Sequence, residues 1–484
     1  MKAGRFRCGF TSITSLVLVA SAVSGMKVLA AAPASKPNIL VIFTDDHGFA
    51  DLGAQGIRTD VKTPHLDRLA ADGVRCTRGY VTAPQCVPSR AGLLTGRHQN
   101  RFGVEDNLKG PLPHSEKTVA DRLRAAGYLT GMVGKWHLDV AYTAGQPSKG
   151  KRTPAKKSAR GTPQAMPDHL PPRHGFDEYF CGAMRQYHAS HDLEGRPLEK
   201  PPQLVPESRF RVDVQTEAAL SFIERNHERP FFLYLAYFAP HVPLEATPEY
   251  LSRFPGEMPE ERRLALAMIA AMDDGVGRIR KLLAEKGISQ QTLVFFISDN
   301  GAPLKPGAWD GSLNEPLVGE KGMLTDGGVR VPFMVAWPGI LPQGVVYEQN
   351  VSSLDVAATA ITAAGVKVDP SWKLEGVDLV PYLSGHVSDA PHPELFWRWR
   401  SQAAVLAGNW KYLRVADEEF LFDTRTPGGE RRNVLREHAA MAATLKAKLD
   451  AWCHELPQPG FPQTTHAEDQ LFFQNHALLR LQKR

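Results

Sequence analysis

Cys86 begins a segment whose residue types could bind an anion and react with it. The segment runs from Cys86 to Gly96 and has the sequence CVPSRAGLLTG. Pro88 suits the first turn of a helix, where its missing N–H breaks no hydrogen bond, and the alanine and leucines after it favour helix. We therefore expect Cys86 at a helix N-terminus, where unpaired N–H groups and the helix dipole favour an anion. Arg90 lies one turn further on the same face, within reach of an oxygen carried by residue 86.

The plain alternative for Cys86 is a buried structural thiol, which is a common fate of a lone cysteine. The chain has five cysteines, of which Cys8 lies close to the N-terminus. If residue 86 serves chemistry, three others remain, which is too few for a disulfide framework and enough for one bridge at most. The sequence does not say which pair among Cys76, Cys181 and Cys453 would form it.

Four apolar runs have the pattern of strands that are buried on both faces of a parallel sheet. They cover residues 37–44, 130–134, 231–238 and 293–298. Each run ends in polar residues, and in an open α/β sheet ligands bind at the carboxyl ends of the strands. The polar residues at these four ends are Asp45, Asp46, Lys135, His137, His241, Asp299 and Asn300. Together with Cys86 they predict one site at one edge of the sheet.

Taken alone, each of these groups also fits an ordinary role. Asp45-Asp46 and Asp299-Asn300-Gly301 are common turn sequences, since Asp and Asn favour turns and caps. His241, between two prolines, could lie in a rigid surface loop, and Lys135 and His137 could be solvent-exposed. Adjacent carboxylates in an apolar setting repel each other, however, unless a cation lies between them. The expected meeting of all four groups at one edge therefore favours a functional site.

Helical segments alternate with these strands, at residues 63–69, 118–126 and 261–285, as judged by their caps and periodicity. This alternation predicts an α/β fold with a large, mostly parallel central sheet flanked by helices. The helix expected at 354–364 closes the sheet, so the main domain is predicted to cover residues 33–368.

Residues 369–455 are predicted to form a smaller C-terminal subdomain. Short strands are expected at 395–400, 403–407, 410–415 and 420–423, and a helix follows at 438–454. Strands followed by a helix suit a small antiparallel sheet with one helix packed on it. Residues 456–484 are expected to be a tail, for which the sequence suggests no role.

The first 32 residues have the features of a secretory signal peptide. Basic residues precede an apolar stretch, and Ala30-Ala31-Ala32 supplies the small residues that cleavage needs. Lys27 interrupts the apolar run, and no later segment approaches the roughly 20 apolar residues of a membrane helix. We therefore expect a protein exported to the periplasm or the extracellular space without a stable membrane anchor.

Outside this leader the charge is nearly balanced. The formal net charge of +5 includes four positive residues in the leader, which leaves about +1 for the rest, too little to steer polyanions. Residues 141–172 are locally basic, with six lysines and arginines and no acid between positions 149 and 160. We interpret them as a solvated, flexible insertion, although an arm that attracts a polyanionic polymer is an alternative. Nucleic acid is not expected as a partner, because interleaved aromatic residues are absent.

The segment from Cys86 to Gly96 matches, without interruption, the signature of the type I sulfatases. Over most of residues 37–340 the chain resembles this arylsulfatase-like family of the alkaline phosphatase superfamily. Further segments with the family's pattern are Gly134-Lys135-Trp136-His137, Pro240-His241-Val242-Pro243, Gly319-Glu320-Lys321-Gly322 and Gly327-Gly328-Val329-Arg330-Val331-Pro332.

The resemblance implies that a maturation enzyme oxidises the cysteine to formylglycine, an aldehyde whose hydrate attacks sulfur. By the same analogy Arg90 stabilises the deprotonated diol, and Lys135 and Lys321 neutralise sulfate oxygens. His241 is the expected general acid for the departing alcohol, since an ordinary histidine pKa of about 6.5 allows proton delivery near neutrality. His137 is expected to deprotonate the second hydroxyl, so that sulfate leaves and the aldehyde is restored.

The resemblance also implies one divalent cation per chain. Asp45, Asp46, Asp299 and Asn300 match the family's ligands, with residue 86 as a further ligand. Carboxylate and amide oxygens suit Ca²⁺ and fit Zn²⁺ poorly.

Together these features predict a sulfatase that hydrolyses sulfate monoesters on a carbohydrate, such as a sulfated glycan or oligosaccharide. One rival is a phosphatase or phosphodiesterase of the same superfamily, but such an enzyme is expected to carry a Ser or Thr nucleophile and two metals. Another is a glycan-binding relative without turnover, which the intact catalytic residue types disfavour. The sugar, the sulfated position, exo or endo action and the oligomeric state stay open. Guesses for the substrate rim are Arg185, Tyr187, His188, His191, Asp192, Trp309-Asp310-Gly311 and Asn314-Glu315.

Overall fold

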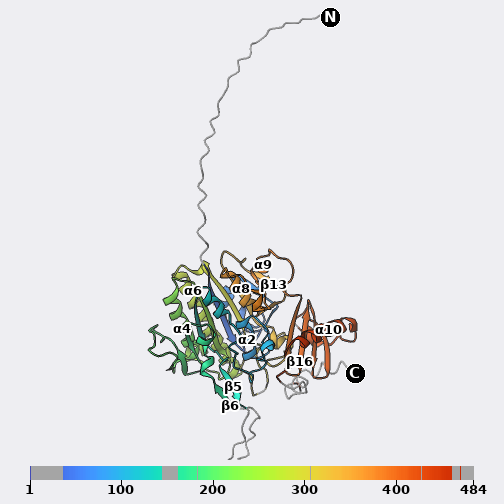
Figure 1. The fold of residues 1–484 in the computed structure, drawn as a ribbon, viewed down its shortest axis with the longest axis horizontal. Helices are drawn as coiled ribbons and strands as arrows, with labels where there is room; N and C mark the ends of the chain where they lie inside the picture. Colours follow the sequence, from blue (N-terminus) through green and yellow to red (C-terminus); the bar gives the residue numbers. More distant parts are fainter. Residues whose placement is uncertain are drawn as a thin grey trace, which may run out of the picture. The chain divides into compact units, whose positions relative to one another are not determined.

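Ten strands form one mixed sheet in the protein (Figure 1). The computed structural model describes Met1 and residues 36–143, 162–182, 184–305, 307–426, 428–460 and 469. Across the sheet the strands are β13 (Val345–Tyr347), β2 (Val74–Cys76), β12 (Phe333–Ala336), β11 (Thr292–Ser298), β1 (Asn38–Asp45), β10 (Phe231–Pro240), β4 (Leu129–Gly134), β7 (Glu178–Cys181), β8 (Gln186–Ala189) and β9 (Gln203–Pro206).

The centre of this sheet is parallel, as the sequence predicts. β1 pairs in parallel with β10 on one side and β11 on the other, and β10 pairs in parallel with β4. The outer strands β12, β8 and β9 pair antiparallel with their neighbours. The α/β prediction is therefore confirmed, with parallel pairing in the centre and antiparallel pairing towards both edges. Because the four central strands point the same way, the residues that follow them meet at one edge.

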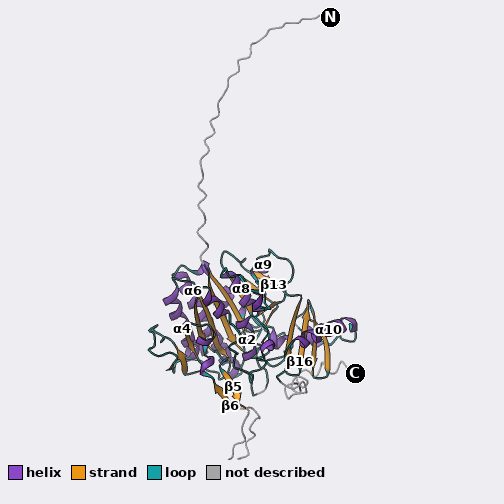
Figure 2. Cartoon of the chain, viewed as in Figure 1, coloured by secondary structure: helices purple, strands orange, loops and turns teal. Residues whose placement is uncertain are grey.

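Helices cover both faces of the sheet (Figure 2). On β1, Ile39, Val41 and Phe43 pack in one apolar cluster, while Leu40 and Ile42 pack in another on the opposite face. This alternation follows from the two-residue period of a strand. The longer helices are α1 (Pro64–Ala71), α2 (Cys86–Thr95), α3 (Val119–Ala125), α4 (Arg211–Asn226), α6 (Glu260–Glu285) and α8 (Asp355–Ala363). Of these, α2, α3 and α8 add to the first cluster and α1, α4 and α6 to the second. Shorter helices are α5 (Pro248–Leu251), α7 (Asp326–Val329) and α9 (Val380–Leu383).

The C-terminal elements form the predicted antiparallel sheet with one helix. Its strands are β15 (Glu394–Trp399), β16 (Gln402–Ala407), β17 (Trp410–Val415) and β18 (Glu418–Asp423), and α10 (Ala439–Glu455) packs on them. Several buried contacts join this sheet to the rest. Among them, the indole N–H of Trp397 donates to Val81 O at 2.7 Å, and the ammonium of Lys411 lies 2.9 Å from Asp326. The domain boundaries at residues 368 and 455 stay predictions.

Some sequence predictions fall on residues that the structure does not describe. These are nearly all of the proposed signal peptide, the basic part of the 141–172 insertion and most of the C-terminal tail. The four described cysteines are all free thiols. Within the described ranges, every helix is too short or too polar to cross a membrane.

The buried ion triad of Lys411 with Asp326 and Glu430 predicts a large stability effect. All three side chains are almost inaccessible to solvent, with Lys411 Nζ at 2.9 Å from Asp326 and 2.8 Å from Glu430. Lys411→Met leaves Glu430 without its cation and Asp326 with Arg330 alone, so we expect a loss of about 3–5 kcal/mol in the free energy of unfolding, measured with denaturant. Lys446→Met, which breaks an exposed pair with Glu419, is the control and should cost at most about 1 kcal/mol. Equal losses in the two variants would contradict this account.

Candidate active site

Two neighbouring aspartates end the central strand β1, and both are buried. Lys135 Nζ lies 2.5 Å from Asp45 Oδ2, and Lys321 Nζ lies 2.7 Å from both carboxylate oxygens of Asp46. Asp46 has a φ of 60°, a left-handed conformation that aspartate tolerates better than most residues. That turn and the two lysines hold adjacent carboxylates in a setting where they would otherwise repel each other.

Lys135 reaches this point through a turn that requires glycine. Gly134, the last residue of β4, has a φ of +97°, and a Cβ there would lie 2.0 Å from Ala236 O on β10. The chain therefore leaves the sheet sharply and presents Lys135 directly over the end of β1. The sequence placed both lysines at the site, and the structure brings them to the two aspartates.

Cys86 is the first residue of α2, as its sequence predicts. The thiol is buried; it donates to Asp45 Oδ1 at 3.4 Å and accepts from Lys321 Nζ at 3.3 Å. Burial, and then the negative charge of Asp299, raise the pKa of the thiol well above its ordinary value. Since the thiolate is the reactive form of cysteine, an unmodified Cys86 is a poor nucleophile at neutral pH.

Arg90, one turn further along α2, is completely buried beneath the cluster. Its guanidinium donates to Asp299 Oδ2 at 2.8 Å and to the Lys135 carbonyl at 2.9 Å. The expected bond from Arg90 to an oxygen carried by residue 86 stays a prediction, since residue 86 is a thiol in the structure. Among the described residues Nε has no hydrogen-bond partner, which leaves one donor of Arg90 unused.

Asp299 and Asn300 follow β11 and complete the carboxylate cluster. Asp299 Oδ1 accepts from the Asp46 backbone N–H at 3.1 Å, and the Asn300 amide N–H donates to Asp46 Oδ1 at 2.5 Å. Burial, and then the charge of Asp45, raise the pKa of Asp299 to about 7. The opposite atom of the amide, Asn300 Oδ1, is buried and lacks a partner within the described part of the chain.

This donor set fits a hard divalent cation. Ligand atoms of Asp45, Asp46, Cys86 and His241 lie within 4.8 Å of one another, and Asp299 and Asn300 bond directly to Asp46 or its backbone. Rotating the side-chain amide of Asn300 by half a turn would place its unpaired oxygen beside the Asp46 carboxylate, where both oxygens could bind the same cation. Oxygen donors from several carboxylates and an amide are the ligands that Ca²⁺ prefers. The fit rests on the buried oxygens and on this unpaired amide oxygen.

The two predicted histidines lie at the mouth of the cluster. His241 is partly exposed, at 23% of its side chain, and its Nε2 is 3.7 Å from Asp46 Oδ2. Its Nδ1 lies 2.6 Å from Val242 O, which leaves Nε2 to face the cluster. His137 has a φ of 60°, and its buried Nδ1 has no partner among the residues described. Burial is the largest cause that lowers both histidine pKa values, with Lys135 adding to it.

A cavity of about 550 Å³ opens beside these histidines. Lys135, His137 and His241 line it together with His188 and Arg211, and its remaining wall is largely apolar. Its size is in the range of small-molecule sites, which combine apolar walls with a few polar groups. Of the guesses for the substrate rim, His188 does line this cavity.

Arg211, the first residue of α4, is a site residue that sequence reasoning missed. Its side chain is buried, lies over the Phe238 ring and donates from Nη2 to the carbonyls of His241 and Pro243. Nε and Nη1 are buried, and in the described ranges neither has a hydrogen-bond partner, although Glu245 approaches Nε to 3.7 Å. No motif marks this arginine; only its place at the start of a helix after a loop hints at a role.

Three other rim guesses do not line this cavity. Tyr187 is buried and stacks on Phe180, so its role is packing. Asp192 pairs with Arg196 on the surface. Asp310 is completely buried rather than part of a rim, and burial followed by the charge of Asp46 raises its pKa well above the ordinary value. Tyr187 and Asp310 are therefore deeper than expected, because loop sequence alone does not reveal depth.

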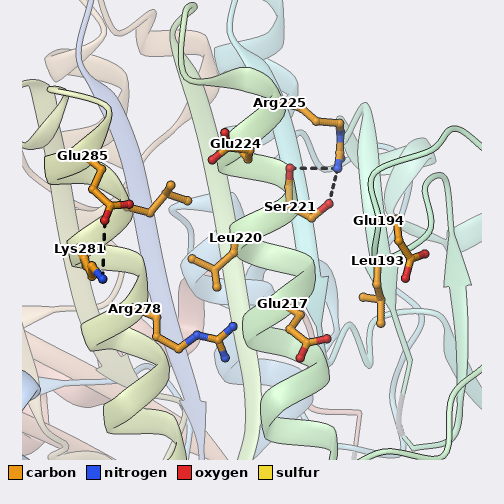
Figure 3. A pocket seen from close by; sticks show the side chains of 11 residues that line it. Leu193, Glu194, Glu217, Leu220, Ser221, Glu224, Arg225, Arg278, Lys281 and Glu285 are labelled. Carbon is orange, nitrogen blue, oxygen red and sulfur yellow. Dashed lines mark hydrogen bonds and ion pairs between the residues drawn. The ribbon is translucent and has the colours of Figure 1, made fainter.

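A second cavity, of about 620 Å³, lies between α4 and α6 and is remote from the predicted residues (Figure 3). Its polar side chains are paired with one another or with neighbouring residues, such as Arg225 with Ser221 and Glu178, and Lys281 with Glu285. Mixed charges paired in this way are typical of a solvated helix surface. We therefore take the 550 Å³ cavity as the candidate active site.

Comparison with known proteins identifies the family. The family model described as Sulfatase matches residues 37–366. N-acetylgalactosamine-6-sulfatase of Rattus norvegicus is 33% identical over 431 residues, covering 83% of this chain and 76% of the relative. Arylsulfatase A of Bos taurus is 34% identical over 419 residues, covering 78% and 75%. The crystal structure of Ps i-CgsB in complex with k-i-k-neocarrahexaose has a TM-score of 0.73 and 28% identity, covering 93% of this chain and 99% of that one.

The family match covers the strands, the helix α2 and the loop of Lys321 that build the site. Relatives above 30% identity extend it over more than three quarters of the chain. The chain therefore belongs to the sulfatases, the sulfuric ester hydrolases of the alkaline phosphatase superfamily.

Proposed function

We propose that this sulfatase removes sulfate from a carbohydrate, with a formylglycine made from Cys86 as its nucleophile. The observation that carries the proposal is the setting of Cys86 at the start of α2. The residue touches Asp45 and Lys321 in the middle of the charged cluster, yet burial and Asp299 keep its thiol protonated. A residue so placed for reaction, but inert as a thiol, fits a side chain that is chemically converted before use.

We further propose one Ca²⁺, held by Asp45, Asp46, Asp299, Asn300 and residue 86. Bound there, the cation would lower the cost of negative charge on the nucleophile and polarise the sulfate. Support comes from the buried oxygen donors and from the unpaired Asn300 Oδ1 among the described residues.

Lys135 and Lys321 would then change partners. Each ammonium lies against an aspartate, Lys135 on Asp45 and Lys321 on Asp46. Three buried carboxylates already balance the three cations Arg90, Lys135 and Lys321. Added divalent charge makes the cluster net positive, so the two ammonium groups are available to the sulfate oxygens. Positive groups fixed where charge develops are the usual way in which enzymes stabilise such transition states.

Two proton transfers fall to the histidines at the mouth. His241, with Nε2 on the side of the cluster, would protonate the alcohol oxygen as the S–O bond breaks. Burial lowers its pKa, so Nε2 would first have to take up this proton, which the charge of Asp45 favours. His137, kept neutral by burial and Lys135, would take a proton from the hydrate so that sulfate leaves. A neutral imidazole can accept a proton, which suits the second role.

The cavity supports a sugar as the alcohol portion of the substrate. It holds His188 and Arg211 beside apolar walls, a combination that can bind hydroxyl groups and a ring face. One relative is named for N-acetylgalactosamine 6-sulfate and one solved relative is in complex with a neocarrahexaose. Export through residues 1–32 and processing by a formylglycine-generating enzyme complete the proposal.

A phosphatase of the same superfamily is the enzymatic alternative. Hydrolysis of 4-nitrophenyl sulfate and 4-nitrophenyl phosphate by the matured protein, followed by a panel of defined sulfated oligosaccharides, separates the two. Preference for sulfate and release of sulfate from a sugar are expected. Faster hydrolysis of the phosphate would contradict the proposal.

Substitution of Cys86 tests the nucleophile. Cys86→Ala lacks the Cβ heteroatom from which the aldehyde is made, so turnover should fall by about a thousandfold or more, as for loss of other catalytic nucleophiles. Peptide mass spectrometry of the active wild-type protein should find the aldehyde or its hydrate at position 86. Cys76→Ala, which alters another buried thiol, is the matched control and should keep its activity. An unmodified thiol in fully active protein would refute the assignment.

Removal of calcium tests the cation site. Exhaustive chelation should abolish turnover and lower the thermal unfolding midpoint, and added Ca²⁺ should restore both. At a calcium concentration of about 100 times Kd, the folded state gains about 2.7 kcal/mol over the calcium-free one. Asp46→Asn should weaken this calcium-dependent shift. Full activity in protein shown to be metal-free would contradict the role of the cation.

Arg211 is predicted to position His241. Arg211→Gln releases the carbonyls of His241 and Pro243, and a small displacement of a catalytic group can cost about a hundredfold in rate. We expect kcat to fall by about tenfold to a hundredfold. The kcat of Arg211→Lys should be intermediate, because lysine keeps the charge but lacks the planar guanidinium that bonds both carbonyls. Arg209→Gln is the control, since Arg209 is exposed and pairs with Glu207 and Glu217. Unchanged kcat in Arg211→Gln would show that the loop holds its position without the arginine.

A further inference from the structure

Three histidines outside the catalytic cluster converge beside Trp136. His114 lies in the loop before α3, and His169 and His174 lie in two short 3-10 turns, Pro167–His169 and Pro171–His174. One ring nitrogen or more from each residue lies within 4.8 Å of the others. The ring of His114 is 4.1 Å from that of His169 and 5.3 Å from that of His174, between centroids. Residues so far apart in sequence are brought together only by the fold.

Two of these rings have a nitrogen free to bind a ligand. His169 Nδ1 lies 2.8 Å from Leu112 O, so Nδ1 carries the proton and Nε2 keeps its lone pair. His174 is buried at 1% exposure, and its Nε2 lacks a hydrogen-bond partner throughout the described residues. A buried polar atom without a hydrogen-bond partner is destabilising, so an unpaired nitrogen here indicates that a ligand binds to it. A backbone carbonyl that fixes the tautomer of a histidine is also a usual feature of metal ligands.

The surroundings keep His174 neutral. Burial, and then His114 and His169, lower the pKa of His174 to about 3, and Lys117 acts in the same direction. Imidazole binds metals in its neutral form, so protons do not compete for the ring at neutral pH. His114 is exposed, which gives an ion access from solvent.

We propose that His114, His169 and His174 form a second metal site, for a borderline dication of the zinc class. Imidazole nitrogen suits Zn²⁺ and Cu²⁺, whereas the oxygen cluster at Asp45 suits Ca²⁺. Zinc–nitrogen bonds of about 2.0–2.1 Å require the three nitrogens to draw together to about 3.3 Å. The rings now stack at 14° and 16° to His114, so binding turns the exposed His114 side chain. A water molecule completes the tetrahedron.

This site would brace one wall of the catalytic cavity. The Trp136 indole N–H donates to His169 O at 2.8 Å, and Thr118 Oγ1 donates to His174 O at 2.7 Å. Trp136 stands between Lys135 and His137, and Leu170 lines the cavity itself. The ion would thus tie the loop before α3 and the 167–174 turns to the end of β4. The inference rests on these contacts and is independent of the proposed reaction.

Zinc titration of the full chain tests the site. The titration is done with calcium-loaded protein in a Cys86→Ser background, so that the thiol at the catalytic cluster cannot bind zinc. Calorimetry and metal analysis should find one zinc per chain, and zinc should raise the thermal unfolding midpoint. His114→Ala and His169→Ala should each weaken zinc binding by about tenfold or more and abolish the thermal shift. His454→Ala, which removes an exposed histidine of α10, is the control and should behave like the parent.

The outcomes separate the possibilities clearly. His114 is exposed, so its variant should fold, and its circular dichroism should match that of the parent. Zinc binding that is lost in His114→Ala and His169→Ala but kept in His454→Ala supports the site. Absence of saturable binding, or equal affinity in all of the proteins, overturns it. Zinc held at Asp45, Asp46 and His241 would give equal affinities, and so it also counts against the proposal.

Discussion

The burial of six charges at one end of the sheet is the constraint on which the rest of the structure depends. An ion buried alone costs several kcal/mol, and removing one partner of a buried pair is strongly destabilising. The carboxylates end two adjacent strands, while their cations come from helix α2, from the end of β4 and from the loop before α7. Those elements therefore have to meet at fixed positions. The six residues are Asp45, Asp46, Asp299, Arg90, Lys135 and Lys321.

This charge cluster and the cavity beside it have different physical characters. The cluster is buried, balanced and tied to the parallel core, so it can hold an ion and a nucleophile in constant geometry. The cavity is bounded by loops, by His137 and His241, and by an arginine that holds the loop of His241 through its backbone. A rigid centre with a loop-built wall is how one fold can keep one reaction while its substrates vary. The charge cluster carries the residues shared with the sulfatases, whereas the cavity determines which sugar is bound.

Much of the centre could be predicted from the sequence, because strand periodicity and strand ends carry strong signals. The apolar runs before Asp45, Lys135, His241 and Asp299 became β1, β4, β10 and β11, and α2 begins at Cys86. The partners of Arg90 could not be foreseen, since they depend on which strands are neighbours in the sheet. The sheet order, and not the sequence order, brings Asp299 beneath α2.

Residues whose role depends on depth were harder to predict. Arg211 has no motif, and its function arises because its helix begins against the loop of His241. Asp310 was taken for a rim residue and is fully buried. His114, His169 and His174 have no regular spacing, so only the folded chain shows them as a cluster. In each case the function of the residue depends on a contact between segments far apart in the sequence, which a local sequence pattern does not predict.

A high-resolution crystal structure of the matured protein with calcium tests the central claim most directly. The account predicts an aldehyde hydrate at residue 86, within bonding distance of one cation that Asp45, Asp46, Asp299 and Asn300 share. An unaltered thiol at that position, in crystals of a preparation that hydrolyses sulfate esters at full rate, would contradict it.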